Sequence, residues 1–131
     1  MHELLDASAV TLARWIRQRK LSPRELLEAL IARIADVNPA INAVIAERHD
    51  AARAEARAAE HRVMHEPAED LPPLLGLPYT AKEYISARGM PLSAGIWSRR
   101  HIRAETDAET VARLHRAGAI LVGITNVPEG G

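Results

Sequence analysis

Residues 76–85 read GLPYTAKEYI, and residues 89–95 read GMPLSAG. The first stretch is a short, mostly apolar run that ends on a lysine, Lys82, and the second is a loop rich in glycine, proline and serine. Only Lys20 and Lys82 among the seventeen basic residues are lysines, and the rest are arginines. A buried lysine can lose its proton, whereas an arginine effectively cannot. Lys82 is therefore a candidate base. The alternative is a lysine whose stem covers apolar surface while its head reaches water.

Composition places the chain among globular proteins. Its 131 residues are enough for one domain with a core, and 47% of them are hydrophobic. A net charge of zero gives no electrostatic reason to expect nucleic acid or an anionic membrane as a partner. The lack of cysteine excludes a disulfide, a thiol nucleophile and a thiolate metal site. No signal peptide or membrane-length apolar run is recognisable, so a cytoplasmic protein is expected.

Apolar periodicity predicts helices alternating with strands. Helices are expected near residues 8–19, from the Ser22 cap to a stop at Asn38-Pro39, over about 50–65, and from a capping box at 106–109 to Gly118. Strands are expected at 41–46, 77–82 and 119–123. This order predicts an α/β fold with a mixed or parallel sheet flanked by helices. Three strands would leave two long exposed edges, so residues 1–131 are expected to form a single partial domain, one piece of a larger one.

With these elements placed, the chain resembles the N-terminal part of the amidase signature family. The resemblance covers nearly the whole chain. It is sharpest in four segments, which read LGLPYTAKE (75–83), GMPLSAG (89–95), DAETVARL (107–114) and GITNVPE (123–129). Each segment alone is moderate evidence, but the set is specific in this order and spacing. The resemblance implies the incomplete N-terminal portion of an amidase fold.

The resemblance also implies a catalytic device, a Ser–cis-Ser–Lys triad whose base is Lys82. A neutral lysine would take the proton of the cis-serine and so activate the nucleophilic serine toward an amide carbonyl. Burial disfavours the charged form of a lysine and lowers its pKa, which suits a base. Ser93 lies in the loop that approaches the active site in this family, which makes it a candidate substrate-binding residue. A small-molecule amide is the implied substrate, with no cofactor and no metal.

Departures from the family pattern limit what the resemblance implies. Both serines of the triad belong to a Gly/Ser-rich signature that these residues do not contain, and no serine here lies in a Gly-x-Ser-x-Gly elbow. The chain alone is therefore expected to be inactive. Ile96 and Ile124 replace a serine and a lysine common in the family, which suggests a divergent or decayed member. Three alternatives stay open: the A-type subunit of a glutamyl-tRNA amidotransferase, a non-catalytic interaction module or decayed paralogue, and a Schiff-base role for Lys82. The oligomeric state is also left open.

Overall fold

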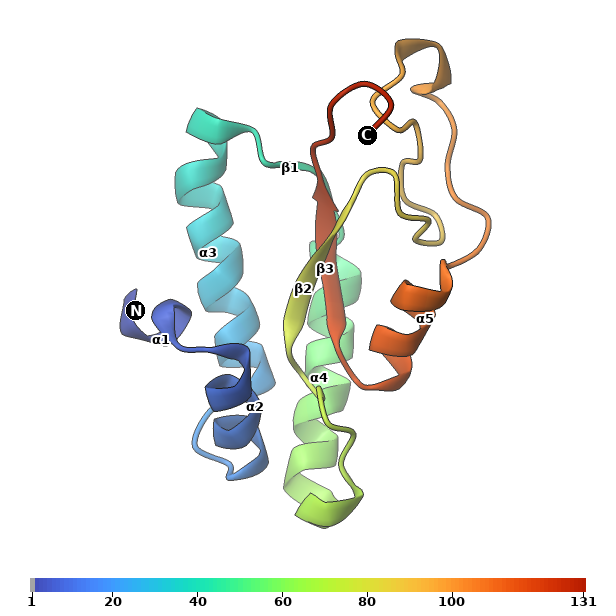
Figure 1. Ribbon diagram of the computed structural model, residues 1–131. Coiled ribbons are helices and arrows are strands. Elements are labelled where there is room, and N and C mark those ends of the chain that lie inside the picture. Colours follow the sequence, from blue (N-terminus) through green and yellow to red (C-terminus); the bar gives the residue numbers. More distant parts are fainter. Residues whose placement is uncertain (1) are drawn as a thin grey trace.

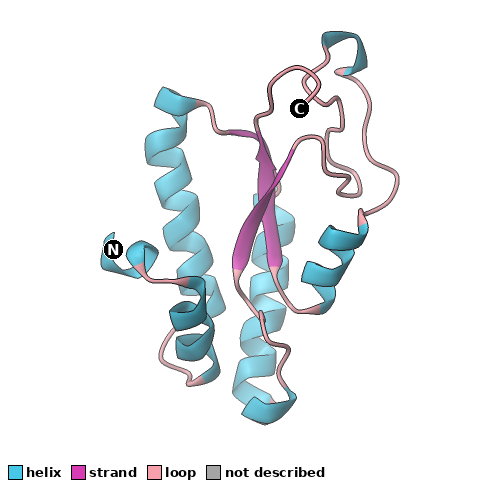
Figure 2. Ribbon diagram, viewed as in Figure 1, coloured by secondary structure: helices cyan, strands magenta, loops and turns pink. Residues whose placement is uncertain are grey.

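The computed structural model describes residues 2–131 as a small mixed sheet flanked by helices (Figures 1 and 2). The elements in chain order are α1 His2–Asp6, α2 Ala9–Arg17, α3 Pro23–Ile41, β1 Val44–Glu47, α4 His49–His65, β2 Pro78–Lys82, α5 Glu109–Arg116 and β3 Ile120–Thr125. Two short 3-10 turns lie at Ala68–Asp70 and Trp97–Arg99. The α/β class predicted from the sequence is confirmed.

The sheet has the strand order β1-β3-β2, with β3 in the centre. Strand β2 runs parallel to β3, with Lys82 opposite Thr125, whereas β1 pairs antiparallel to β3. The parallel pairing brings the carboxyl ends of β2 and β3 to one end of the molecule. The loop that follows β2 and the last residues of the chain lie at that same end (Figure 1).

Two hydrophobic clusters enclose the central strand. On one side, Ile120 and Val122 of β3 pack with apolar residues of α3 and α4, among them Leu27 and Ala56. On the other side, Leu121 packs with Ala81 of β2, Val111 of α5 and two residues of the loop after β2. Burial on both faces explains why β3 is an uninterrupted apolar run, as expected for a strand of a parallel sheet.

Serine caps fix the start of two helices, and the cap at Ser22 was predicted. Ser8 precedes α2 and accepts a hydrogen bond from the Thr11 N–H at 3.2 Å. Ser22 precedes α3 and accepts from the Arg24 N–H at 3.1 Å, with proline at the first helical position. Among the described residues, no helix combines the length and the apolarity needed to cross a bilayer.

The predicted stop of this helix at Asn38-Pro39 is wrong, because α3 continues to Ile41. A proline this close to the end of a helix removes only one backbone bond, and the helix closes instead at Asn42, which adopts a left-handed conformation with φ 48°. The Asn38 side chain bonds both the N–H and the C=O of Val44 at 2.8 Å. These bonds organise the turn, so that β1 begins at Val44 rather than at residue 41.

The predicted capping box at residues 106–109 is also wrong. Helix α5 begins at Glu109 after Ala108, which makes no side-chain capping bond. Asp107 instead accepts a hydrogen bond from the Arg88 N–H at 2.7 Å. The cap therefore lies two residues after Thr106, the position that the pattern predicts, and Asp107 inside the predicted box is held by a long-range contact.

Candidate active site

Lys82 is the last residue of β2, at the carboxyl end of the strand. Its neighbours Ala81 and Glu83 are buried, with 6% and 1% of their surface exposed, whereas Lys82 and Thr80 are exposed. This alternation follows from the strand, because successive side chains point to opposite faces. The face of β2 that carries Ala81 packs against the hydrophobic cluster that includes Val111 of α5. The opposite face, which carries Thr80 and Lys82, is open.

The head of Lys82 has few neighbours. Its Nζ lies 5.9 Å from the centroid of the half-exposed Tyr84 ring. Within residues 4–131, no side-chain hydrogen bond or salt bridge of Lys82 is formed. The burial that the family resemblance implies for this lysine is therefore not present in the chain as it stands. Its position at the strand end is observed, and its role as a base remains a prediction.

The end of β3 is tied to the residues around Lys82. The N–H of Glu83 donates to the carbonyl of Thr125 at 3.0 Å, and the Thr125 hydroxyl donates to the carbonyl of Ala81 at 3.4 Å. Asn126 then reaches back to the start of β1, where its side-chain amide donates to the Asn42 carbonyl at 3.3 Å. Thr125 and Asn126 therefore join the end of β3 to the end of β2 and to the turn before β1.

The loop after β2 folds back as two antiparallel arms. The N–H of Gly89 donates to the Ala104 carbonyl at 2.8 Å, and the N–H of Leu92 donates to the Ile102 carbonyl at 3.0 Å. Ser93 lies at the far end of the first arm, where its hydroxyl accepts the N–H of Gly95 at 3.1 Å. This local bond shows where the Ser93 side chain lies, and substrate binding by Ser93 stays a prediction.

Sequence reasoning missed Glu83 as a feature of the site. Its carboxylate is almost completely buried and accepts hydrogen bonds from the backbone N–H groups of Ser93 and Gly95. The only signal in the sequence was an acidic residue directly after the strand-end lysine and shortly before a Gly/Ser-rich loop. Its burial depends on how that loop folds, which no local pattern specifies.

Several serines of the chain serve local structure. Ser8 and Ser22 cap helices, and Ser22 also donates to the Glu60 carboxylate. Ser86 donates its hydroxyl to the Thr106 carbonyl. In the described part of the chain, no serine hydroxyl is hydrogen-bonded to Lys82.

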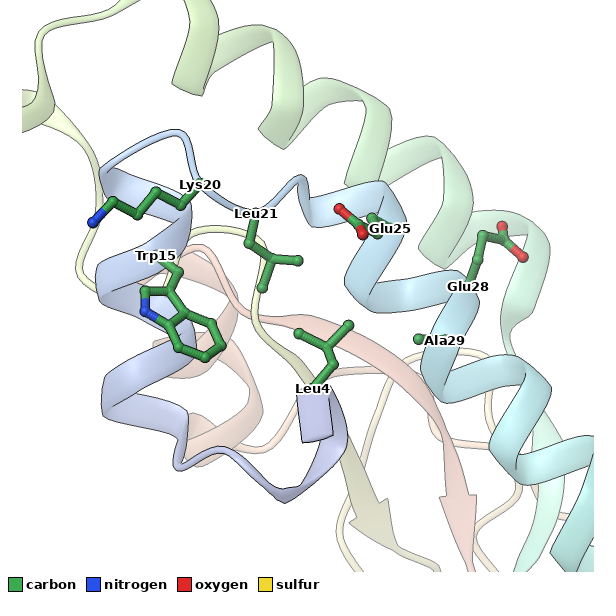
Figure 3. A pocket seen from close by; sticks show the side chains of 7 residues that line it. All are labelled: Leu4, Trp15, Lys20, Leu21, Glu25, Glu28 and Ala29. Atoms are coloured by element: carbon green, nitrogen blue, oxygen red, sulfur yellow. The ribbon is translucent and has the colours of Figure 1, made fainter. Parts of the chain in front are cut away.

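Several cavities lie elsewhere on the molecule. One of about 620 Å³ is formed mainly by α1, α2 and α3, and Figure 3 shows Leu4, Trp15 and Leu21 around it, with Glu25 and Glu28 along α3. Another, of about 220 Å³, adjoins α5 and is lined by Arg48, Tyr79, Arg88, Asp107, Val111, His115 and Leu121. Burial, with a smaller contribution from the charge of Asp107, raises the pKa of Tyr79 there. Neither of these two cavities is lined by Lys82.

Known proteins are similar to this chain in sequence. The model of the family described as Amidase matches residues 25–131. Fatty-acid amide hydrolase 2-A of Danio rerio is 44% identical over 131 residues, covering 96% of this chain and 25% of the relative. The A-type subunit of the glutamyl-tRNA(Gln) amidotransferase of Acidothermus cellulolyticus is 35% identical over 129 residues, covering 98% of this chain and 25% of the relative.

Solved structures agree with the sequence matches. A bacterial aryl acylamidase of the amidase signature enzymes superimposes with a TM-score of 0.86 at 28% identity, covering 95% of this chain and 26% of the acylamidase. The chain thus spans about a quarter of the length of the relatives that it matches. Because the family model matches most of the sequence and the fold superimposes on amidase signature enzymes, the chain belongs to the amidase family.

Proposed function

We propose that this chain is part of an amidase that hydrolyses a carboxylic amide, with Lys82 as the base of a Ser–cis-Ser–Lys triad. The observation that carries the proposal is the position of Lys82 at the carboxyl end of β2, beside the end of the parallel strand β3. Ligands of open α/β sheets bind outside the carboxyl ends of the strands. The chain is also more similar in sequence to a fatty-acid amide hydrolase than to the amidotransferase relative, which favours hydrolysis.

In the proposed reaction, the neutral amine of Lys82 takes a proton from the cis-serine, which in turn takes the proton of the nucleophilic serine. The nucleophile attacks the carbonyl of a small-molecule amide, the amine leaves with a proton, and an acyl-enzyme forms. Water then hydrolyses the ester to release a carboxylic acid. In this proposal both serines come from outside these residues, since the Gly/Ser-rich signature that carries them in the family is not among them.

The exposure of Lys82 fits a division of the site between this chain and further protein. A lysine acts as a base only when its surroundings disfavour the charged form, and burial is the usual cause. The open face of Thr80 and Lys82 is available for such a cover. We therefore expect the chain alone to be inactive, although it carries the proposed base.

The proposal is tested in a longer protein that contains this chain and hydrolyses an aryl amide. Lys82→Ala and Lys82→Arg should both lower kcat by about 10²- to 10⁴-fold, the usual contribution of a general base, because arginine cannot accept the proton. Lys20→Arg is the matched control, since it makes the same change at an exposed lysine, and it should leave kcat unchanged. The 131-residue chain alone serves as the blank and should show no turnover. Wild-type turnover by Lys82→Arg would remove Lys82 from the role of base.

A further inference from the structure

Within residues 4–131, Glu83 is the only charged residue among the buried side chains, with 1% of its surface exposed. In the described part of the chain, no lysine, arginine or histidine forms a salt bridge with it. A buried carboxylate needs hydrogen-bond donors to offset the loss of water. The donors here are backbone amides of the loop after β2.

The loop presents these amides in a concave turn. The N–H of Ser93 donates to one oxygen of the Glu83 carboxylate, and the N–H of Gly95 donates to the other at 3.3 Å. Ala94 and Gly95 both adopt positive φ angles, 53° and 72°. Backbone N–H groups that converge in such a turn form a nest that binds anions. Glu83 fills this nest from within the same chain.

The nest also contacts the segment that follows β3. The Gly130 N–H donates to the Ala94 carbonyl at 2.8 Å, and the backbone of Gly95 leaves no room for a side chain beside Pro128. The N–H of Glu83 itself donates to Thr125 at 3.0 Å. Three segments therefore meet at one residue: the end of β2, the loop of residues 89–95 and the end of β3.

We infer that Glu83 is a positioning residue that holds the loop of residues 89–95 at a fixed place next to Lys82. A carboxylate suits this task because both of its oxygens only accept hydrogen bonds, so each can meet one of the two N–H groups. Glutamine would keep one acceptor and turn an NH₂ group toward the other donor. This clamp, the hold of Glu83 on the loop, is supported by the hydrogen bonds described above, and its importance for catalysis rests on the proposed function.

The test measures amide hydrogen exchange in the 131-residue chain and in two variants. Glu83→Met keeps the length of the side chain and its packing but removes both acceptors, and Glu83→Gln keeps one. The reporter is the N–H of Ser93, whose acceptor is Glu83. Its exchange should be about ten- to a hundredfold faster in Glu83→Met, the effect expected for a lost bond to a charged group, and intermediate in Glu83→Gln.

Controls separate a clamp from general loss of stability. The amide of Val122, in the buried central strand, should change less than that of Ser93 in both variants. Glu60→Gln makes the same chemical change at a glutamate that contacts Ser22, and it should leave the Ser93 amide unchanged. Unchanged Ser93 exchange in Glu83→Met, or equal acceleration of Ser93 and Val122, would overturn the inference.

If a variant does not fold, the wild-type chain still decides the question. Scalar coupling across the hydrogen bonds should connect the amide nitrogens of Ser93 and Gly95 to the carboxyl carbon of Glu83. Absence of both couplings in the folded chain would refute the clamp. Neither measurement uses amide turnover, so a failure of the clamp and a failure of the proposed amidase function are distinguishable.

Discussion

Substitution of Gly95 by alanine tests how closely the loop packs against the end of the sheet. Gly95 has φ 72°, and a Cβ added there would lie 2.8 Å from the carbonyl oxygen of Pro128 and 3.0 Å from that of Val127. Backbone atoms cannot move aside as a flexible side chain can. Gly89 is the matched control, because it has a similar φ of 80° but no atom within 4 Å of an added Cβ.

Both variants place an alanine in a left-handed conformation, and only Gly95→Ala adds a steric clash. A left-handed conformation costs an alanine about 1–2 kcal/mol, and the loss of backbone freedom in the unfolded chain returns about 0.4–1 kcal/mol. Gly89→Ala should therefore lower the free energy of unfolding by about 1 kcal/mol. Gly95→Ala adds the overpacking against Pro128, about 1–3 kcal/mol more, for a total of about 2–4 kcal/mol.

Urea unfolding of the 131-residue chain measures both values from the transition midpoints and slopes. The difference between the variants isolates the contact, since the strain of positive φ is common to both. Equal losses in Gly89→Ala and Gly95→Ala would show that the loop does not rest on Pro128. The assigned contact between the loop and Pro128, on which the positions of Ser93 and Glu83 depend, would then be wrong.

Two further predictions concern the rest of the fold. Leu27 of α3 is 1% exposed, and Leu27→Ala should lower the free energy of unfolding by about 2–5 kcal/mol. Ile41→Ala in the same helix, at an exposed residue, should change it by at most about 0.5 kcal/mol. Similar losses for the two variants in urea unfolding would contradict the assigned core. The hydrogen bond from Ser22 lowers the pKa of Glu60 below its ordinary 4.5. The stability that this bond contributes is therefore fully present above about pH 4.5 and is lost as the pH falls through the lowered pKa of Glu60. Glu60→Gln should therefore flatten the fall in urea midpoint below about pH 4.5, and Glu69→Gln, at an exposed turn, should not; identical acid profiles for wild type and Glu60→Gln would refute the linkage.

Local signals were enough to predict much of the fold. The start of α3 follows from Ser22 and Pro23 alone, because a cap and a fixed φ act within one turn. The central strand β3 follows from its continuous apolar run. The end of α3 could not be read in the same way, since Asn38 bonds to Val44 beyond the helix. The predicted capping box also failed where long-range contacts act, since Asp107 within it bonds to Arg88 of the distant loop.

The same difference between local signals and long-range contacts applies to the candidate site. The strand-end position of Lys82 was predictable from the run that precedes it, and the structure places it there. Its exposure was not predictable, because exposure depends on what covers the open face of β2. Glu83 was missed because its burial arises from backbone amides ten and twelve residues further along the chain. Long-range contacts of this kind carry no pattern in the local sequence.

Chemical rescue tests most directly whether Lys82 works as a base. In a longer, active protein that contains this chain, Lys82→Ala leaves a gap where the amine was, and added primary alkylamines can supply the missing base. Turnover should rise with the concentration of the unprotonated amine and with its basicity, as general-base catalysis requires. Lys82→Ala that keeps wild-type turnover without any added amine would contradict the claim.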